Sequence, residues 1–410
     1  MSRVITRVMA TIRPFRGVRP DPEVAGRVVA PPYDVLSEAE ARAIHSENPK
    51  TFLQVTRPEV NLPDGVDAHS REAYAAGRIA LETLLAEGSL VQDEEPSFYL
   101  YFQKMGDHRQ TALMALCSTE EYDRGLIKKH EHTRPDKEQD RVDHILGTGA
   151  QTGLVFLAYR QRHDIREAVA QASGEILFTL TSEDGVEHGL TRVSDRLSVE
   201  RLQRLFDEVD VLYIADGHHR SAAASRVAAR LDGQRGSAWF LCGIFPDDSL
   251  NCMAYNRMVR DLGGFTPSAL LKTLDGDFEV TVALDAVPTE RGTFTMYLEG
   301  RWYLLEPRVL DESDPVACLD VAVLQDRILS PLLGIEDPRR DTRVSFVGGI
   351  RGPGYLQDAV DERRAAVAFH MVPTGLDQLF AVADADRVMP PKSTWFEPKL
   401  AGGVLVHRLE

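Results

Sequence analysis

The chain has few cysteines and no long apolar run. Its four cysteines are far apart and lack the paired spacing of a zinc site: Cys117, Cys242, Cys252 and Cys318. This disfavours a disulfide framework or a zinc finger, and we expect reduced, mostly buried thiols. No stretch is long enough to span a bilayer, and arginines such as Arg3, Arg7, Arg13 and Arg16 interrupt the apolar runs near the start. We therefore expect no signal peptide, no membrane partner and a cytoplasmic location.

Basic residues are in the minority. The 410 residues include 63 acidic and 47 basic side chains, which gives a formal net charge of −16. An excess of negative charge repels polyanions, so it disfavours broad binding to nucleic acid and leaves room only for a local basic pocket. The hydrophobic content of 43% is ordinary for a soluble globular protein, and the length suits about two or three domains.

Segments typical of strands and of helices alternate along the chain, without an internal repeat. This alternation predicts an α+β or mixed α/β fold. We expect an N-terminal α/β region over 1–120, a phosphate-binding core over 121–245 and a C-terminal α+β region over 246–410. The expected strands lie at 28–35, 51–56, 98–103, 111–117, 153–159, 174–193 (as a pair), 209–214, 239–245, 278–282, 293–298, 344–347 and 367–371. The expected helices lie at 68–87, 221–231, 267–274 and 316–329, with another opening near Ser37.

The most informative stretch joins a strand to a helix. The apolar residues 209–214 are typical of a buried strand, and the alanine-rich residues 221–231 are typical of a helix. Asp216 and Gly217 supply a tight turn between them, after which the first helical amides lack intrahelical partners. Because these amides and the helix dipole both favour negative charge, the corner predicts a phosphate or carboxylate site.

The side chains after the turn strengthen this prediction. His218, His219 and Arg220 add donors where the charge of an anion would lie, and Ser221 belongs to the same predicted cradle. The alternative is that Asp216 caps the helix and the histidines are ordinary surface residues. Two histidines and an arginine in succession favour the anion site.

A second concentration of polar residues lies at 121–144. Glu131 follows an amphipathic strand and stands between His130 and His132, where a carboxylate can act as general base toward a hydroxyl. A helix is predicted after the proline at position 135, and on it Lys137 and Arg141 project from one face and can hold a second anion. The alternative is a solvated, charged loop and helix.

The histidines of this segment also suggest a second hypothesis, a metal-dependent hydrolase whose ligands are His130, His132 and His144. Their spacing is not that of a His-Glu-x-x-His zinc motif, and alternate residues of a strand share a face without a third ligand at a fixed spacing. We therefore assign no residue as a ligand of a protein-held metal. Mg²⁺ that arrives with nucleotide phosphates is favoured instead, with Asp216 as a candidate ligand.

Two further segments have a mixed polar and apolar character. Lys392, Ser393 and Thr394 follow a double proline, and they are the expected polar contacts if this segment closes an active site. The alternative is a proline-braced strand that packs its aromatic residues on a core. Arg57, which lies in a similar stretch at 48–59, is a further candidate for substrate binding.

Four segments in this order resemble the hallmarks of the bacterial and archaeal domain-of-unknown-function family 1015 (DUF1015). They are Ala30-Pro31-Pro32-Tyr33-Asp34-Val35, His130-Glu131-x-Thr133 with Lys137 and Asp140-Arg141, Asp216-Gly217-His218-His219-Arg220, and Met389-Pro390-Pro391-Lys392-Ser393-Thr394. The resemblance spans nearly the whole chain. The Asp-Gly-His-His-Arg element is in turn similar to the phosphate-binding motif of the ParB and sulfiredoxin superfamily, whose nucleotide-binding members include free serine kinases.

This resemblance implies a ParB/sulfiredoxin-like core with added N-terminal and C-terminal α/β regions. It also implies a nucleotide-dependent phosphotransferase that uses ATP or ADP with Mg²⁺ on a small hydroxylated metabolite, with free serine or phosphoserine favoured, in the kinase or the reverse direction. The expected partners are this metabolite and the nucleotide, and a homodimer is compatible with them. A ParB-like nucleotide-binding regulator and the metal-dependent hydrolase stay open as alternatives.

The resemblance also assigns roles within the predicted site. Glu131 becomes the general base, with His130 and Asp216 beside it in the catalytic group. Gly217, His218, His219, Arg220 and Ser221 form the phosphate cradle. Thr133, Lys137, Arg141 and Arg57 are the expected substrate-binding residues.

Overall fold

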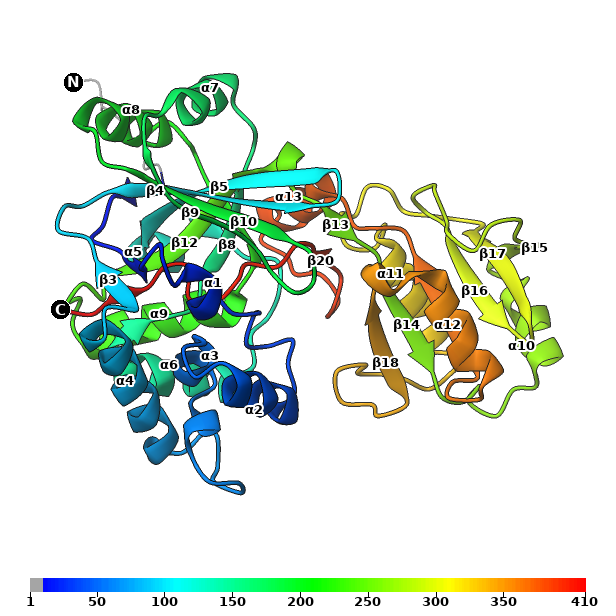
Figure 1. The fold of residues 1–410 in the computed structure, drawn as a ribbon. Coiled ribbons are helices and arrows are strands. Elements are labelled where there is room, and N and C mark those ends of the chain that lie inside the picture. Colours follow the sequence, from blue (N-terminus) through cyan, green and yellow to red (C-terminus); the bar gives the residue numbers. More distant parts are fainter. Residues whose placement is uncertain (1–9) are drawn as a thin grey trace, which may run out of the picture. The chain divides into compact units, whose positions relative to one another are not determined.

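The structure is a computed structural model that describes residues 10–410 (Figure 1). Arg3 and Arg7, which are part of the pattern that disfavours a signal peptide, lie outside the described residues. The chain divides into two compact units: unit 1 extends to Leu250 and includes Pro398–Glu410, and unit 2 is Asn251–Glu397. Both units combine helices with sheets, which confirms the α+β class. The expected regional boundaries at 120 and 245 stay a prediction.

Unit 1 is built on a mixed sheet. Its strand order is β6-β11-β8-β12-β5-β4-β10-β9, and β1 pairs with β5 beside this path. β8 is parallel to β12 and β11 is parallel to β6, whereas the other neighbours are antiparallel. The strands are β1 (Ile12–Arg13), β4 (Phe98–Met105), β5 (His108–Ser118), β6 (Ile127–Lys128), β8 (Val155–Tyr159), β9 (Glu175–Thr181), β10 (Glu187–Val193), β11 (Leu212–Asp216) and β12 (Trp239–Pro246). Strands from both sides of residue 120 therefore share one sheet.

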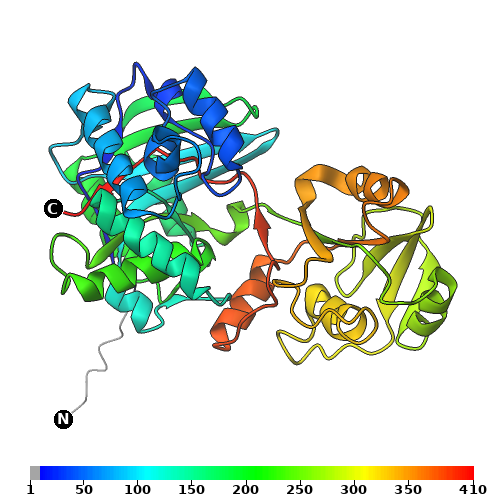
Figure 2. The same ribbon diagram turned by 90° about the horizontal axis from the view of Figure 1, so that it is seen from below.

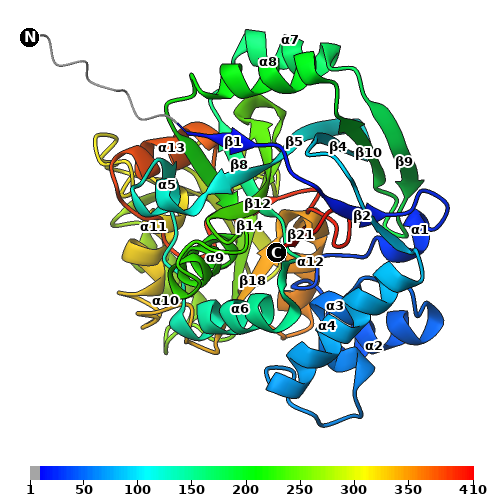
Figure 3. The same ribbon diagram turned by 90° about the vertical axis from the view of Figure 1, so that its left-hand side faces the viewer.

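Helices cover both faces of this sheet. α7 and α8 lie on one face, and α6 and α9 lie on the other (Figures 1 and 3). α6 packs between α9 and α4. The helices of unit 1 are α1 (Ala25–Val28), α2 (Glu38–Glu47), α3 (Leu53–Thr56), α4 (Arg71–Ala86), α5 (Thr119–Asp123), α6 (Pro135–Thr148), α7 (His163–Gln171), α8 (Arg196–Phe206) and α9 (His218–Arg230), with short 3-10 turns at Pro58–Asn61 and Asp247–Ser249. Within residues 10–410, no helix is both long and apolar enough to cross a lipid bilayer.

The centre of unit 1 is apolar. Phe240, Cys242 and Ile244 of β12 are at most 1% exposed, as are Leu157 of β8 and Ile214 of β11. Alternate residues of a strand point to the same face, so these side chains stack between the sheet and its helices. Two short ladders complete the unit: β2 (Val18–Pro20) pairs with β3 (Leu90–Gln92), and β21 (His407–Arg408) pairs with β7 (Ala150–Gln151).

Two of the expected strands are wrong. Within residues 51–56, Leu53–Thr56 form the short helix α3, and Phe52, Leu53 and Val55 are fully buried. A short apolar run that is buried on all sides has no periodicity that separates a strand from a helix. Residues 28–35 form only the end of α1 and one bridge from Ala30, because the two prolines that follow have no N–H to donate to a ladder.

Most other local predictions in unit 1 are confirmed. The expected hairpin is β4 and β5, the pair within 174–193 is β9 and β10, and the helix over 68–87 is α4. Ser37 opens α2 with a capping box, since its hydroxyl accepts from the Glu40 amide while the Glu40 carboxylate accepts from the Ser37 amide. These elements were predictable because their signals are local.

Unit 2 contains an antiparallel sheet of order β15-β17-β16-β19-β14-β18. α12 and the α11 turn lie on opposite sides of these strands (Figure 2). The strands are β13 (Cys252–Met253), β14 (Tyr255–Val259), β15 (Phe278–Val282), β16 (Phe294–Leu298), β17 (Arg301–Pro307), β18 (Val344–Gly348), β19 (Val367–Met371) and β20 (Trp395–Phe396), and β13 pairs with β20. The helices are α10 (Pro267–Leu274), α11 (Asp320–Leu324), a π-helical turn (Gln325–Leu329), a 3-10 turn (Gly349–Arg351), α12 (Gly352–Asp361) and α13 (Leu376–Asp384).

Candidate functional site

The corner between β11 and α9 turns at Gly217. This residue has φ of 96° and ψ of 28°, a left-handed conformation that glycine adopts without strain. α9 begins directly afterwards at His218, and its N-cap residue Gly217 has no side chain that could cap the first turn. The alternative in which Asp216 caps the helix is therefore wrong, since Asp216 is the last residue of β11. The first amides of this 13-residue helix have no partner within the helix, and together with the helix dipole they favour an anion.

Two histidines meet beside this corner. The rings of His130 and His218 are edge to face, with centroids 4.5 Å apart, and the His130 amide lies 3.5 Å from His218 Nε2. Burial lowers the pKa of His130 to about 4, and burial together with His130 lowers the pKa of His218 well below its usual value. Both rings are therefore neutral at pH 7. Because Nε2 of His218 accepts a hydrogen bond, its proton lies on Nδ1.

His130 also leaves one atom unsatisfied. The side chain is only 2% exposed, and its Nδ1 has no hydrogen-bond partner within residues 10–410. Buried polar atoms are normally paired, and an unpaired atom on a ring that contacts His218 at the start of α9 points to a ligand or a water at this place. This atom is a second, independent indication that the corner receives a polar group.

The loop that carries Glu131 is attached to the corner on both sides. His130 precedes Glu131 and contacts His218, while the Arg134 amide donates to His219 Nε2 at 3.0 Å. The structure thus brings the second polar segment to the first, as the sequence analysis expected. Glu131 is half-buried in this loop, and its role as general base stays a prediction.

Arg220 is a fixed cation at the corner. Its Nη1 donates to the Leu154 carbonyl, and its Nη2 lies 3.1 Å from Asp216 Oδ2 and 3.6 Å from Asp34 Oδ2. Burial opposes the charge, but Tyr33, Asp216 and Asp34 outweigh this effect and raise the pKa of the guanidinium. The arginine therefore keeps its charge beside the helix amides, and two carboxylates share it.

Ser221 and Thr133 have local partners. Ser221 is fully buried, and its hydroxyl donates to the Gly217 carbonyl at 2.9 Å. Thr133, in the Glu131 loop, donates its hydroxyl to Glu138 Oε1. Both side chains therefore stiffen the elements around the corner, and their direct contact with a ligand stays a prediction.

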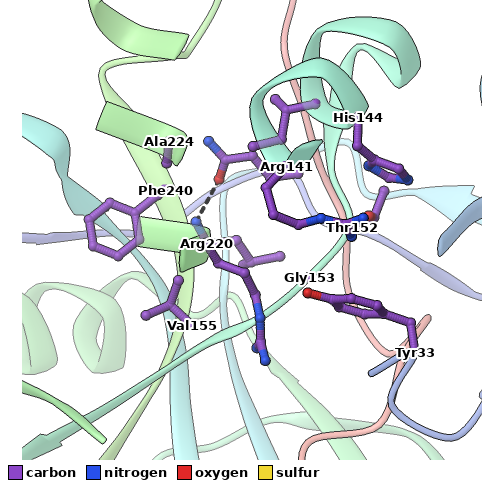
Figure 4. A pocket seen from close by; sticks show the side chains of 12 residues that line it. Tyr33, Arg141, His144, Thr152, Gly153, Val155, Arg220, Ala224 and Phe240 are labelled. Atoms are coloured by element: carbon purple, nitrogen blue, oxygen red, sulfur yellow. Dashed lines mark hydrogen bonds between the residues drawn. The ribbon is translucent and has the colours of Figure 1, made fainter. Parts of the chain in front are cut away.

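A small pocket opens beside Arg220 (Figure 4). Its cavity volume is about 30 Å³. Arg141 from α6 and Arg220 from α9 flank the ring of Tyr33, with guanidinium carbons 4.6 Å and 5.9 Å from the ring centre. Gly153 admits the Arg220 side chain, because a Cβ there would lie 3.1 Å from Arg220 Cδ. The lining residues are Tyr33, Arg141, His144, Ile145, Gln151, Thr152, Gly153, Val155, Arg220, Ala224, Phe240 and Leu241.

Arg141 is paired with its neighbour Asp140. Arg141 Nε and Nη2 donate to Asp140 Oδ2 at 2.8 Å and 2.5 Å, while Asp140 Oδ1 lies 2.7 Å from the Tyr74 hydroxyl and 2.5 Å from His69 Nδ1. Burial alone would raise the pKa of Asp140, but Arg141 and Tyr74 outweigh it and lower this pKa to about 2. Lys137, one turn earlier on α6, is exposed to solvent. Of the predicted pair, only Arg141 lines the pocket.

Arg57 binds the backbone of the loop that carries Tyr33. Its Nη1 donates to the carbonyls of Tyr33 and Leu36 at 3.0 Å and 2.7 Å, and its Nε lies 2.5 Å from Glu59 Oε1. These bonds hold the loop that carries Tyr33. The structure thus shows Arg57 bound to protein groups, and the predicted contact with substrate stays untested.

The segment 392–394 belongs to unit 2. Ser393 is buried, with its hydroxyl 2.6 Å from the Pro390 carbonyl, while Lys392 is exposed and has a φ of 62°. Arg257 Nη2 donates to the Lys392 carbonyl at 2.9 Å, and Thr394 is half-buried. These contacts fix the shape of the segment within unit 2, and its predicted part in closing a site stays a prediction.

The three histidines of the hydrolase alternative do not form one group. His144 lies on α6 with its Nε2 2.9 Å from the Val55 carbonyl, His130 contacts His218, and His132 is exposed. Throughout residues 10–410, no three His, Cys, Asp or Glu side chains gather as a metal site would require. The structure gives this alternative no support.

Sequence reasoning missed part of the pocket. From the sequence, Tyr33 is named only within a motif, Gly153 is included only as the first residue of an expected strand, and Gln151 and Thr152 have no predicted role. Their one signal is the placement of polar residues and a glycine directly before the buried strand β8. That signal is weak, because many strands begin this way.

Solved structures with a similar arrangement include a conserved hypothetical protein from Pyrococcus furiosus, at 13% identity and a TM-score of 0.35, covering 69% of this chain and 90% of that one. A free serine kinase in complex with AMP matches at 14% identity and a TM-score of 0.36, covering 69% of this chain and 86% of that one. SbnI with a C-terminal truncation, from Staphylococcus aureus, matches at 11% identity and a TM-score of 0.38, covering 69% and 82%.

No curated protein matches the chain. One family model matches residues 12–322, which is more than half of the sequence, and it is described as "Protein of unknown function (DUF1015)". The expected resemblance is confirmed, and the chain belongs to the DUF1015 family.

Proposed function

We propose that the protein is a cytoplasmic, nucleotide-dependent phosphotransferase that acts on a small hydroxylated metabolite, with free serine or phosphoserine as the first candidate. The observation that carries the proposal is the corner at Gly217, where the start of α9 lies beside the unpaired Nδ1 of His130 and the fixed charge of Arg220. Phosphate is the anion that this combination suits best, since it offers several acceptor oxygens. The similarity of the Asp-Gly-His-His-Arg element to a known phosphate-binding motif supports the same choice.

Phosphoryl transfer needs little covalent chemistry from a protein. Positioning of the reactants and stabilisation of charge on the transferred group supply most of the rate. The amides after Gly217 and the guanidinium of Arg220 would provide this stabilisation. His218 and His130 are neutral, so they would direct hydrogen bonds at the phosphate without changing the charge of the site.

Glu131 would accept the proton of the metabolite hydroxyl in the kinase direction. In the reverse direction the same carboxyl group returns that proton, because both directions pass through one transition state. The loop of Glu131 is attached to the corner through His130 and Arg134, and these contacts support the proposal that Glu131 acts on a group bound at the corner. ATP or ADP is the proposed phosphoryl donor.

The residues present fit a magnesium ion that arrives with the nucleotide. Asp216 and Asp34 are both partly exposed, and both approach the same nitrogen of Arg220, so carboxylate oxygens face the corner in excess of the local positive charge. Asp216 is the first candidate ligand, and one or two carboxylates together with phosphate oxygens are the usual protein share of a Mg²⁺ site. Bound Mg²⁺ would neutralise charge on the phosphates.

The proposal is tested by incubating the protein with ATP, ADP or pyrophosphate and Mg²⁺, against a panel of hydroxyamino acids and their phosphates, and following transfer by ³¹P NMR. We expect transfer with at least one pair, and we expect Glu131→Gln to abolish turnover while nucleotide affinity changes only a few fold. Glu200→Gln, on the exposed face of α8, removes a carboxylate away from the corner and should leave turnover unchanged.

Two outcomes would contradict the proposal in different ways. Nucleotide binding without transfer to any acceptor would favour the ParB-like regulator, which keeps the cradle without the chemistry. Full turnover in Glu131→Gln would remove Glu131 from the mechanism and leave the rest of the proposal standing.

A further inference from the structure

Arg141 faces the pocket with donors left over. Its Nε and Nη2 both donate to Asp140, whereas its Nη1 makes no hydrogen bond within residues 10–410 and is not one of their fully buried unpaired atoms. One face of the guanidinium lies against Tyr33, and only 17% of the side chain is exposed. A guanidinium largely removed from water loses free energy for each donor left unpaired. Nη1 is therefore a donor that water or a ligand can reach at the pocket, and the protein itself provides no acceptor for it.

Two other polar atoms border the same pocket. Thr152 is 6% exposed, and within the described part of the chain its hydroxyl makes no hydrogen bond. His144 Nε2 must donate to the Val55 carbonyl, which can only accept, so Nδ1 of this ring is left as an acceptor. Burial lowers the pKa of His144 to about 4, so the ring is neutral. The pocket thus offers a cationic donor, a hydroxyl and one acceptor.

The size of the pocket limits what can enter. Its cavity volume is about 30 Å³. A water molecule needs ~10–15 Å³ by this measure, so the cavity has room for roughly two waters, or for the two oxygens of one carboxylate. A sugar ring or a nucleobase does not fit in it. Val155, Ala224 and Phe240 supply apolar walls (Figure 4).

The charges around the pocket favour a group with a single negative charge. Arg141 is already paired with Asp140, and Arg220 is shared by Asp216 and Asp34, so the cluster holds two guanidinium groups and three carboxylates. The Arg141 charge is already balanced by Asp140 and no Mg²⁺ is proposed in this pocket, so a doubly charged phosphate suits the pocket less well than it suits the corner. A carboxylate adds one charge and has the planar shape that a guanidinium edge binds best.

We propose that this pocket binds the carboxylate of the metabolite, and that the metabolite is a small 2-amino or 2-hydroxy acid instead of a neutral polyol. Arg141 Nη1 and the Thr152 hydroxyl bind the carboxylate oxygens, and His144 Nδ1 accepts from the amino or hydroxyl group on the next carbon. Tyr33 is the wall that holds Arg141 in place. Arg220 borders both this pocket and the phosphate corner, so the acid end of the metabolite lies next to the phosphate end. The inference rests on the proposed function for the presence of a second, phosphorylated hydroxyl.

The test compares ligands that differ only in the carboxylate. Binding of L-serine against 2-aminoethanol, and of D-glycerate against glycerol, is measured by isothermal titration calorimetry on the full chain without nucleotide. We expect each acid to bind at least ten-fold more tightly than its neutral analogue. Arg141→Gln should remove this difference. Thr152→Val, which keeps the shape of the side chain, should weaken the acids severalfold and leave the neutral analogues unchanged.

A matched control and a separate readout keep the outcomes distinct. Arg196→Gln removes an arginine from the exposed face of α8 and should leave all four affinities unchanged. The inference is overturned by any of three results. These are equal binding of acids and neutral analogues, a preference for acids that persists in both Arg141→Gln and Thr152→Val, and no binding of any probe. Phosphoryl transfer to a neutral alcohol alone would support the proposed function and overturn the inference, whereas carboxylate-dependent binding without any transfer would do the reverse.

Discussion

Replacement of Gly217 by alanine is the sharpest perturbation of the corner. The glycine has a φ of 96°, and a Cβ built on it would meet the Val155 Cα at 3.4 Å, an ordinary contact distance. Space is therefore not limiting, and the effect comes from the backbone conformation. A non-glycine residue held in the left-handed region costs about 1–2 kcal/mol. For a unit of this size, we expect the melting temperature to fall by roughly 2–8 °C.

The same change should weaken nucleotide binding. Relief of the strain at position 217 rotates the peptide groups that follow it, and these carry the first amides of α9. Loss of one hydrogen bond to a charged phosphate corresponds to about 1.5–3 kcal/mol, or roughly a ten- to hundred-fold loss of affinity. Differential scanning fluorimetry and calorimetric titration with ADP measure the two effects separately.

Gly88 provides a matched control. It also has a positive φ, 71°, and a Cβ there would meet nothing within 4 Å. Gly88→Ala should therefore cost a similar amount of stability and leave ADP affinity unchanged. The reasoning is refuted if Gly217→Ala binds ADP as tightly as the native chain, or if both variants lose the same affinity. Unchanged stability in Gly217→Ala would refute the left-handed turn itself.

Two further predictions concern the buried histidines and the glycine beneath Arg220. Burial lowers the pKa of His130 and of His144 to about 4, so between about pH 6.5 and pH 4 the unfolded chain binds more protons than the folded one. The contribution of these neutral rings to the free energy of unfolding is complete above pH 6.5 and is lost as the pH falls toward 4, by roughly 1–3 kcal/mol per ring. Urea unfolding midpoints measured across this pH range will show the loss. His144→Gln should make the midpoint depend less steeply on pH. Gly153→Ala should displace Arg220 and weaken ADP binding severalfold in titrations, while Gly26→Ala, with nothing near its Cβ, should not.

The corner was predictable from the sequence because its signals are local. A buried strand, an Asp-Gly turn and an alanine-rich helix follow one another within about twenty residues, and each signal has its own physical cause. The structure contains the strand, the turn and the helix, but β11 is Leu212–Asp216 instead of 209–214, α9 is His218–Arg230 instead of 221–231, and the cap is Gly217 and not Asp216. The approach of the Glu131 loop was expected from the family resemblance, because sequence spacing alone does not bring together segments 85 residues apart (216 − 131).

The pocket could not be predicted in the same way. Tyr33, Arg141, Thr152 and Arg220 come from four separate segments, and tertiary packing, such as that of α9 against both α6 and β8, brings them together. Arg57 shows that residue type alone does not identify the partner of a side chain. The sequence predicts that Arg57 contacts substrate, which stays a prediction, and in the structure its guanidinium donates to the carbonyls of Tyr33 and Leu36. Charged and polar residue types identify candidate site residues in the sequence. The fold then determines whether their side chains bind a ligand or another group of the protein.

The central claim is that the corner at Gly217 binds the phosphates of a nucleotide. It is tested most directly by calorimetric titration of the full chain with adenosine, AMP and ADP in the presence of Mg²⁺. If the helix amides and Arg220 hold the phosphates, affinity rises from adenosine to AMP to ADP, and this rise is lost in Gly217→Ala. Equal affinity for adenosine and ADP would contradict the account.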